Sequence, residues 1–161
     1  VDFMEGKISD GWIRGVKGNE YAEDLTSGDA TAVIGWSGDM FILASENEGK
    51  FDFAIPESGG TISSDNFVIP YTVGADAKAN AEKMINYYYD PAVAAEVAAY
   101  VNYVCPVKGA QAEMEKIDPD LAKSEYIFPT EKTMAKLNVF RALTTDEETT
   151  WTEAFQKAAG V

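Results

Sequence analysis

The chain contains no histidine and only one cysteine, Cys105, among its 161 residues. The absence of histidine excludes Ser-His-Asp and Cys-His arrangements, most zinc sites and the commonest general base of enzymes. A single cysteine cannot form a disulfide within the chain, which fits the cytosol or an exported bacterial protein that does not rely on disulfides. Cys105 precedes Pro106 in an apolar context, so we interpret it as a packing residue rather than a nucleophile.

Basic residues are also scarce, with 13 Lys and Arg against 27 Asp and Glu, and the net charge is −14. Nucleic-acid binding is therefore disfavoured, because phosphate contacts need clustered Lys and Arg. An acidic surface attracts a cationic ligand over long range, but the same charge is also explained by solubility alone. The charge thus favours a class of ligand without establishing one.

Long hydrophobic runs are missing too, although 46% of the residues are hydrophobic. No run approaches the roughly 20 apolar residues of a membrane-spanning helix. The apolar content suffices for one sizeable core or for two incomplete lobes. The chain begins at Val1, without an initiator methionine or a signal peptide, so we expect it to be a piece of a longer protein.

Three short apolar segments have the length of β-strands. Residues 30–36 (ATAVIGW) predict a strand buried on both faces, and residues 66–70 (NFVIP) predict one that ends at proline. Residues 50–56 (KFDFAIP) place Phe51, Phe53 and Ile55 at period two, which is typical of a half-buried strand.

Helical patterns fill most of the remaining chain, near residues 19–25, 39–44, 76–89, 90–100, 108–116, 130–137 and from 145 onward. Asp90 and Pro91 predict an N-cap and a first helical residue. The sequence Thr145-Asp146-Glu147-Glu148 predicts a capping box for the last helix, with Trp151, Phe155 and Ala158 on one face. Strands interleaved with helices indicate an α/β protein.

Aromatic and acidic residues stand at the ends of several of these elements. Trp36 and Asp39 lie in the motif GWSGD, Asp65 lies in SDN, and Tyr103 lies in VNYVCP. Ring faces attract an ammonium group and a carboxylate fixes it by a charge-assisted hydrogen bond, so this pattern favours a site for a small organic cation.

Each of these residues also has a structural interpretation. Trp36 is explained as a core residue, Asp65 as a turn residue, Asp39 as a helix cap and Tyr103 as the cover of a helix end. The run Tyr87-Tyr88-Tyr89 offers phenolates for ferric iron, but Tyr88 falls on an apolar helix face and no histidine accompanies it. We therefore expect packing there and no metal site.

Four segments taken together carry a family resemblance: GWSGDM, FAIPESGGTISSDNFVIP, INYYYDPAVAAEVAAYVNYVCPVKGA and WTEAFQKA. Their order and spacing, between about residues 18 and 159, resemble the polyamine-binding proteins of bacterial ABC importers. The resemblance implies a periplasmic-binding-protein-like (type II) α/β fold, with a mixed sheet flanked by helices in an incomplete two-lobe architecture. It assigns residues 1–62 to the second lobe, 63–106 to the first lobe with its hinge crossings, and 107–161 to a helical return to the second lobe.

The same resemblance implies roles for individual residues. Trp36 matches a tryptophan that packs on the polyamine methylene chain, Asp65 a carboxylate that holds an ammonium group, and Tyr103 a pocket tyrosine. Arg141 falls where some members have a polar pocket residue, and Ser63 stands where many have a bulky aromatic, so Ser63 alters one wall of the pocket. Asp39, beside Trp36, adds a further carboxylate. No cofactor is implied.

The implied function is capture of spermidine or putrescine without chemistry, so we expect no enzymatic activity. The implied partners are the polyamine and the permease subunits of an ABC transporter. The implied location is the periplasm or, for a lipid-anchored form, the outer face of the cytoplasmic membrane. Another organic cation, an anion held by Arg141, or ferric iron is an alternative ligand, and a carboxylate-based hydrolase or a domain without a ligand is an alternative class. Uncovered sheet edges also favour dimerisation or strand exchange.

Overall fold

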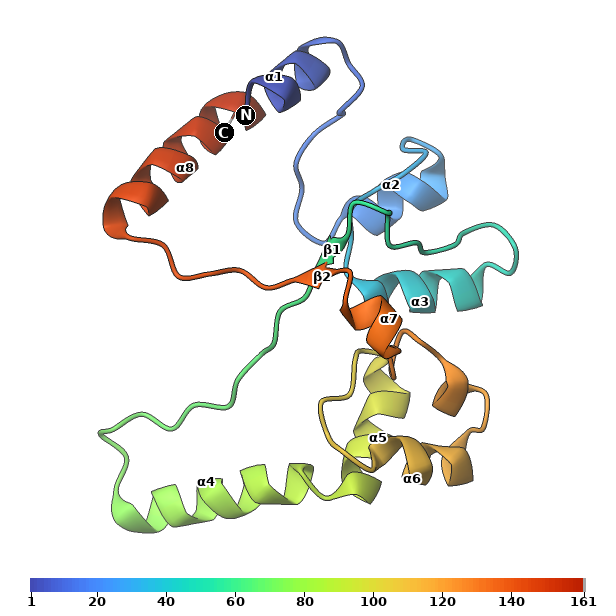
Figure 1. Cartoon of the computed structure of the whole chain (residues 1–161), viewed down its shortest axis with the longest axis vertical. Helices are drawn as coiled ribbons and strands as arrows, with labels where there is room; N and C mark the ends of the chain where they lie inside the picture. Colours follow the sequence, from blue (N-terminus) through green and yellow to red (C-terminus); the bar gives the residue numbers. More distant parts are fainter. Residues whose placement is uncertain (161) are drawn as a thin grey trace. The chain divides into compact units, whose positions relative to one another are not determined.

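The computed structural model describes residues 1–160 (Figure 1). Contacts divide the chain into two units: unit 1 comprises Val1–Gly35 and the segment from Phe140 onward, and unit 2 comprises Trp36–Val139. Unit 1 contains α1 (Asp2–Ser9), α2 (Tyr21–Ser27) and α8 (Thr145–Ala159). Unit 2 contains α3 (Ser37–Glu46), α4 (Ala75–Tyr88), α5 (Pro91–Val101), α6 (Ala110–Ile117), the 3₁₀ turn η1 (Leu121–Lys123), α7 (Glu131–Met134), and strands β1 (Gly60–Thr61) and β2 (Leu137–Asn138).

Unit 1 is a lightly packed set of helices in which α1 lies against α8 (Figure 1). Its buried hydrophobic side chains are Tyr21 and Ala158, as far as residues 1–160 show. Tyr21 lies so close to Gly35 that a Cβ atom on this glycine would stand 2.8 Å from the tyrosine ring. Unit 1 therefore relies on a few contacts rather than on a continuous core.

Unit 2 holds the main hydrophobic core, between α5, α6 and η1. The buried members of this cluster are Ala94, Ala95, Ala98, Ala110, Met114, Ala122 and Ile127. Alanine along α5 lets the backbone of α6 approach closely, and the long Met114 side chain fills the space that remains. We call this cluster the α5–α6 core.

The start of α5 confirms the prediction made from Asp90 and Pro91. Asp90 is the N-cap, its carboxylate accepts a hydrogen bond from the Ala92 N–H at 3.0 Å, and Pro91 is the first helical residue. The helix ends at Asn102, which adopts a left-handed conformation with φ of 57°. Asparagine tolerates this conformation better than most residues, and it turns the chain sharply toward Tyr103.

The sheet in residues 1–160 is one parallel pair, in which Gly60 is opposite Leu137 and Thr61 is opposite Asn138. Gly59 precedes β1 with φ of +95°, and a Cβ atom there would overlap the Lys136 carbonyl oxygen. Glycine is thus required at this position both for its backbone conformation and for the close approach of β2.

The three predicted strands are wrong, since residues 30–36, 50–56 and 66–70 form no strand. The period-two pattern itself persists: Phe51, Phe53 and Ile55 are half-buried and alternate with exposed neighbours. An alternating pattern requires only an extended backbone, whereas a strand also requires a hydrogen-bonded partner. The mixed sheet of the predicted fold is therefore represented here by the β1–β2 pair alone.

The predicted helices are found, with shifted ends. The capping box belongs to Thr144 rather than Thr145: the Thr144 hydroxyl accepts from the Glu147 N–H at 3.3 Å, and Glu147 accepts from the Thr144 N–H at 2.9 Å. The spacing of three residues between hydroxyl and carboxylate decides the position. On α8, Ala158 is buried but Trp151 and Phe155 remain exposed.

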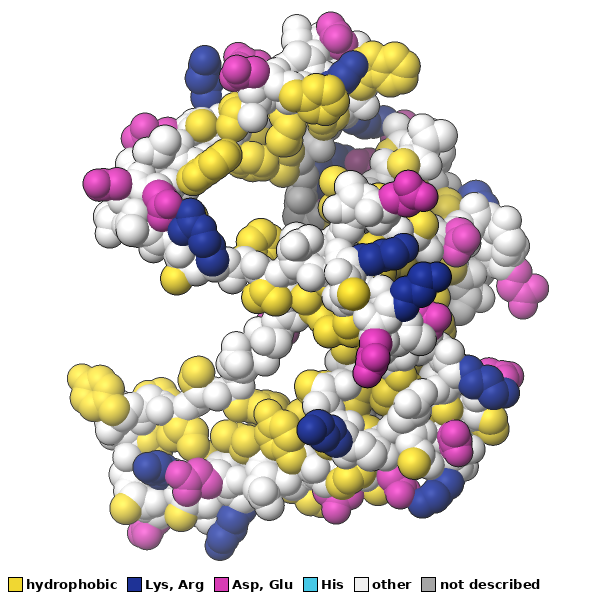
Figure 2. Space-filling model, in the orientation of Figure 1, with side chains coloured by type: hydrophobic (Ala, Val, Ile, Leu, Met, Phe, Trp, Pro, Cys, Tyr) yellow, Lys and Arg dark blue, Asp and Glu magenta, His cyan; other side chains and the backbone are white. Residues whose placement is uncertain are grey.

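Hydrophobic side chains gather on the visible surface over α4 and the extended segment that precedes it (Figure 2). The exposed members there are Phe67, Val68, Tyr71, Met84, Tyr87 and Tyr89. Phe67 and Tyr88 make an edge contact with ring centroids 5.5 Å apart, which holds this segment to α4. The apolar spacing of α4 predicts one face of Ala77, Ala81, Met84, Ile85 and Tyr88. Of these, Ala81, Ile85 and Tyr88 are half-buried, whereas Ala77 and Met84 are exposed.

Candidate functional site

The first turn of α3 brings an aromatic ring and a carboxylate together. Trp36 is the N-cap residue with an extended backbone, and its carbonyl accepts the first helical hydrogen bond from Met40 at 3.1 Å. Asp39 follows within that turn, where the positive end of the helix dipole favours a carboxylate. Buried Met40 and Leu43 fix the other face of α3. The helix thus begins two residues earlier than predicted.

Tyr103 joins this turn from a distant part of the sequence. Its position is set by the left-handed Asn102 at the end of α5, and its hydroxyl donates a hydrogen bond to Asp39 Oδ1 at 2.8 Å. The ring lies directly against Gly38, which has no side chain in the way. We call Trp36, Gly38, Asp39 and Tyr103 the Trp36 cluster.

The Trp36 cluster is accessible to a ligand. The Trp36 side chain is 55% exposed and Tyr103 is 37% exposed, while Asp39 is half-buried. An accessible indole and a carboxylate in one helical turn, with a phenol packed against that turn, can bind an ammonium group by ring and charge contacts. Because the Tyr103 hydroxyl is a neutral donor, it orients the Asp39 carboxylate without cancelling its charge.

Ser63 and Asp65 lie on the extended segment after β1, in the same unit as the Trp36 cluster. Both are exposed, and the Asn66 side chain donates to the Ser64 carbonyl at 3.0 Å, which shapes a local turn. Within residues 1–160 the Asp65 carboxylate makes no hydrogen bond or ion pair. The structure thus brings Trp36, Asp39 and Tyr103 together, and it places Ser63 and Asp65 on the extended segment after β1, with no hydrogen bond to them in the part of the chain that it describes.

Arg141 belongs to unit 1 and binds a carboxylate in the first turn of α8. Its guanidinium donates to both carboxylate oxygens of Glu147, at 3.0 and 2.7 Å. This hydrogen bond raises the pKa of Arg141. The same hydrogen bond, with a further one from the Thr144 backbone, lowers the pKa of Glu147 from 4.5 to about 2. Arg141 therefore supports the capping box in this structure.

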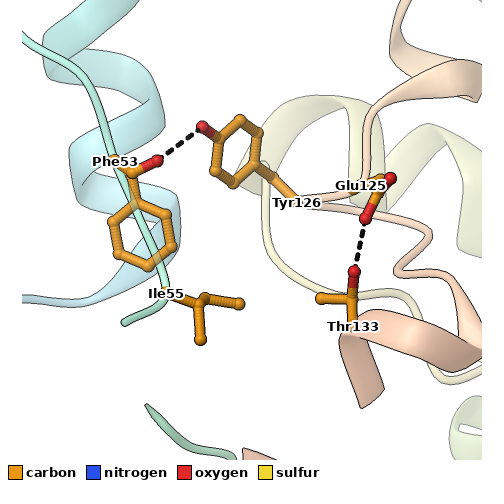
Figure 3. A pocket seen from close by; sticks show the side chains of 5 residues that line it. All are labelled: Phe53, Ile55, Glu125, Tyr126 and Thr133. Carbon is orange, nitrogen blue, oxygen red and sulfur yellow. Dashed lines mark hydrogen bonds between the residues drawn. The ribbon is translucent and has the colours of Figure 1, made fainter. Parts of the chain in front are cut away.

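A hollow in unit 2, of about 190 Å³, is lined by Phe53, Ile55, Glu125, Tyr126 and Thr133 (Figure 3). The Tyr126 hydroxyl donates to the Phe53 carbonyl at 3.2 Å, and its ring contacts Phe53 at a centroid distance of 5.5 Å. Glu125 accepts hydrogen bonds from the Thr133 and Thr130 hydroxyls. The contacts of Tyr126 with Phe53 fasten the extended segment 50–56, and the sequence analysis missed them because these two residues are 73 positions apart.

Residues 4–129 match the family model described as bacterial extracellular solute-binding protein.

The chain belongs to this family.

Three individual relatives are 25–30% identical to this chain. The putrescine-binding periplasmic protein PotF of Escherichia coli is 30% identical over 132 residues, which cover 78% of this chain and 34% of the relative. The putrescine/agmatine-binding protein of Pseudomonas aeruginosa is 25% identical over 131 residues, with the same two coverages. The spermidine/putrescine-binding periplasmic protein of Salmonella typhimurium is 28% identical over 115 residues, covering 71% and 31%. This solute-binding chain spans about a third of the length of these relatives.

Membership in a family of binding proteins confirms the prediction of a non-enzymatic protein at the level of the family. The environment of Cys105 agrees with its interpretation as a packing residue. Its thiol is half-buried and lies 3.9 Å from the Ala94 carbonyl, and burial raises its pKa. A thiol with a raised pKa is a poor nucleophile.

Of the three adjacent tyrosines of this solute-binding chain, Tyr88 packs as expected, whereas Tyr87 and Tyr89 are exposed. The ring of Tyr88 makes edge contacts with Phe67 and with Tyr89, and burial raises the pKa of Tyr88. A phenol with a raised pKa is less ready to bind iron as phenolate. In the described part of the chain, no helix has both the length and the apolar character needed to span a bilayer.

Proposed function

We propose that this chain is part of the solute-binding component of an ABC importer, and that its ligand is a polyamine such as putrescine or spermidine. The observation that carries the proposal is the pairing of Tyr103 with Asp39 beside the exposed Trp36. Relatives of the chain are binding proteins named for putrescine, agmatine or spermidine, which supports the proposal. The acidic net charge of −14 favours a cationic ligand in addition.

In the proposed mechanism the protein captures its ligand without chemistry. Trp36 and Tyr103 pack against the methylene chain and the ammonium groups, and Asp39 accepts a hydrogen bond from one ammonium end. Asp65, on its extended segment, pairs with the other cationic end. Neutral analogues bind weakly because they leave desolvated carboxylates without a partner.

Ser63 sets the selectivity in this proposal. Its small side chain leaves open the wall that a bulky aromatic would form two residues before Asp65. An open wall admits a longer or branched amine as readily as putrescine, so the ligand is defined by its charge more than by its length.

The proposed partners are the permease subunits of the transporter. Ligand capture draws together two lobes, of which residues 1–62 and 107–161 supply parts of one and residues 63–106 part of the other. Closure shifts the population toward the form that the permease accepts. The proposed location is the periplasm, as in the names of the relatives, or the outer face of the cytoplasmic membrane.

Calorimetric titration tests this proposal. Putrescine is added at moderate salt to the protein expressed from the complete gene, with spermidine as competitor and neutral 1,4-butanediol as the control. We expect saturable binding of the amines and none of the diol. Equal heats for amine and diol, or no heat with either amine, would reject a polyamine ligand. Arg141 offers little support for an anion instead, since Glu147 engages both of its terminal nitrogens.

A further inference from the structure

Gly38 lies inside a helix, and its backbone conformation does not require a glycine. It lies in the first turn of α3, it is buried, and its φ is not in the left-handed region that favours glycine. Glycine within a helix is less favourable than alanine because it loses more conformational freedom on folding. The residue therefore needs an explanation outside the backbone of α3.

The ring of Tyr103 provides that explanation. A Cβ atom on Gly38 would overlap the Cε2 and Cδ2 atoms of this ring and would lie 2.6 Å from Cζ. The ring cannot move aside cheaply, since the left-handed Asn102 fixes its backbone and Asp39 holds its hydroxyl at 2.8 Å. Gly6 in α1 is the opposite case, because a Cβ atom there meets nothing within 4 Å.

We propose that Gly38 is a positioning residue for ligand binding. Because Gly38 has no side chain, the Tyr103 ring packs directly against it, and this position lets the Tyr103 hydroxyl donate a hydrogen bond to Asp39. The orientation of the Asp39 carboxylate toward an ammonium group thus depends on the absence of one carbon atom in the preceding residue. This inference rests on the proposed function for the ligand, but its geometric part can be tested without one.

The geometric part is tested by a double-mutant cycle of Gly38→Ala and Tyr103→Ala, followed by urea denaturation of the protein from the complete gene. We expect Gly38→Ala to lower the urea midpoint when Tyr103 is present. With Tyr103→Ala in place, the same substitution should raise the midpoint, as the control Gly6→Ala does, because only the helix preference of alanine remains. Equal effects of Gly38→Ala in both backgrounds would show that the Tyr103 ring does not require a glycine at position 38.

Carbon-13 NMR of labelled tyrosine then separates positioning from mere packing. The Cζ resonance of Tyr103 is assigned by its loss in Tyr103→Phe. In the wild type it should shift when Asp39→Asn is introduced. In Gly38→Ala it should already be displaced and should no longer respond to Asp39→Asn. A resonance that still responds fully would contradict the proposal.

Ligand affinity completes the test. We expect Gly38→Ala to weaken putrescine binding by about tenfold, which corresponds to one broken hydrogen bond to a charged group, while Gly6→Ala leaves it unchanged. Unchanged affinity in Gly38→Ala would overturn its role in binding. If the wild type binds no polyamine, the proposed function fails, and the stability cycle and the NMR shift still confirm or reject the arrangement of Gly38, Tyr103 and Asp39.

Discussion

The α5–α6 core and the extended segment 62–70 belong to the same unit but are held in different ways. In the core, Ala95, Ala110, Met114 and Ile127 are completely buried. The segment 62–70 carries Ser63 and Asp65 on exposed backbone, with the Phe67–Tyr88 ring contact as one of its few attachments. Stability is therefore concentrated in the core, and one part of the proposed binding function is concentrated where packing contributes little.

This contrast predicts that substitutions in the core change folding and that substitutions on the segment change binding. The largest expected effect is that of Met114→Ala. Removing a fully buried methionine leaves a cavity, so the free energy of unfolding should fall by about 2–5 kcal/mol. Urea denaturation measures the loss. Tyr71→Ala, at a side chain that is 99% exposed, is the matched control and should change stability by less than about 0.5 kcal/mol. Similar losses in both variants would remove the contrast.

The second prediction concerns the segment. Asp65→Asn removes the charge and keeps the shape, and it should weaken polyamine binding by about 2–3 kcal/mol, the scale of a hydrogen bond to a charged group. Calorimetric titration measures the change, and the urea midpoint should stay as it is. Glu48→Gln, another exposed carboxylate of unit 2, is the control for net charge. An affinity equal to that of Glu48→Gln would exclude Asp65 from the site.

The third prediction concerns Tyr103, which follows the core helix α5 and also contacts α3. Tyr103→Phe removes the hydroxyl that donates to Asp39 and leaves the ring on Gly38. We expect a loss of about 1 kcal/mol in the free energy of unfolding, since the bond is partly exposed. Thermal unfolding measures it, with Tyr100→Phe as the control at an exposed tyrosine. A loss as large as that of Met114→Ala would mean that the ring itself had moved.

The smallest effect is expected in unit 1 and depends on pH. The pKa of Glu147 is lowered from 4.5 to about 2 by its hydrogen bonds to Arg141 and Thr144. A depressed pKa stabilises the folded state above the ordinary pKa, and this contribution is lost as the pH falls from about 4.5 toward 2. Circular dichroism across this range should show a small loss of helix signal in the wild type, from fraying at the start of α8. Glu147→Gln should flatten that part of the curve, and an unchanged curve would reject the capping role of the carboxylate.

The same contrast explains which elements could be predicted from the sequence. Helices α3, α4, α5, α6 and α8 were predicted because their signals are local: an N-cap, a proline, or a spacing of three to four residues. The strands predicted at 30–36 and 50–56 depend on partners elsewhere, and an apolar run does not identify a partner. Ile34 illustrates the result, because a strand buried on both faces at residues 30–36 would bury it, and it is fully exposed.

In the candidate site too, features with a local sequence signal could be predicted, and features that depend on distant partners could not. Trp36 and Asp39 were found because they share one motif, and Tyr103 was found through the order of several motifs. The hydrogen bond between Tyr103 and Asp39 spans 64 residues, so no local spacing could predict it. Gly38 was missed because it precedes the helix predicted at residues 39–44, and a glycine before a helix is ordinary in sequence. Its significance appears only when the ring against it is known.

The β1–β2 pair has a consequence for the order of folding. Two residues on each strand join positions 60–61 to positions 137–138, and all of residues 62–136 form the excursion between them. Closing so long a loop costs chain entropy, and one short parallel pair offsets little of it, so the pair should form slowly. The α5–α6 core, built from neighbours in the sequence, should therefore form early, and the strand pair should close around it late. Gly59, with its tight approach to Lys136, then acts on the last step of folding: a side chain there would slow the closing of the unit more than the formation of its helices.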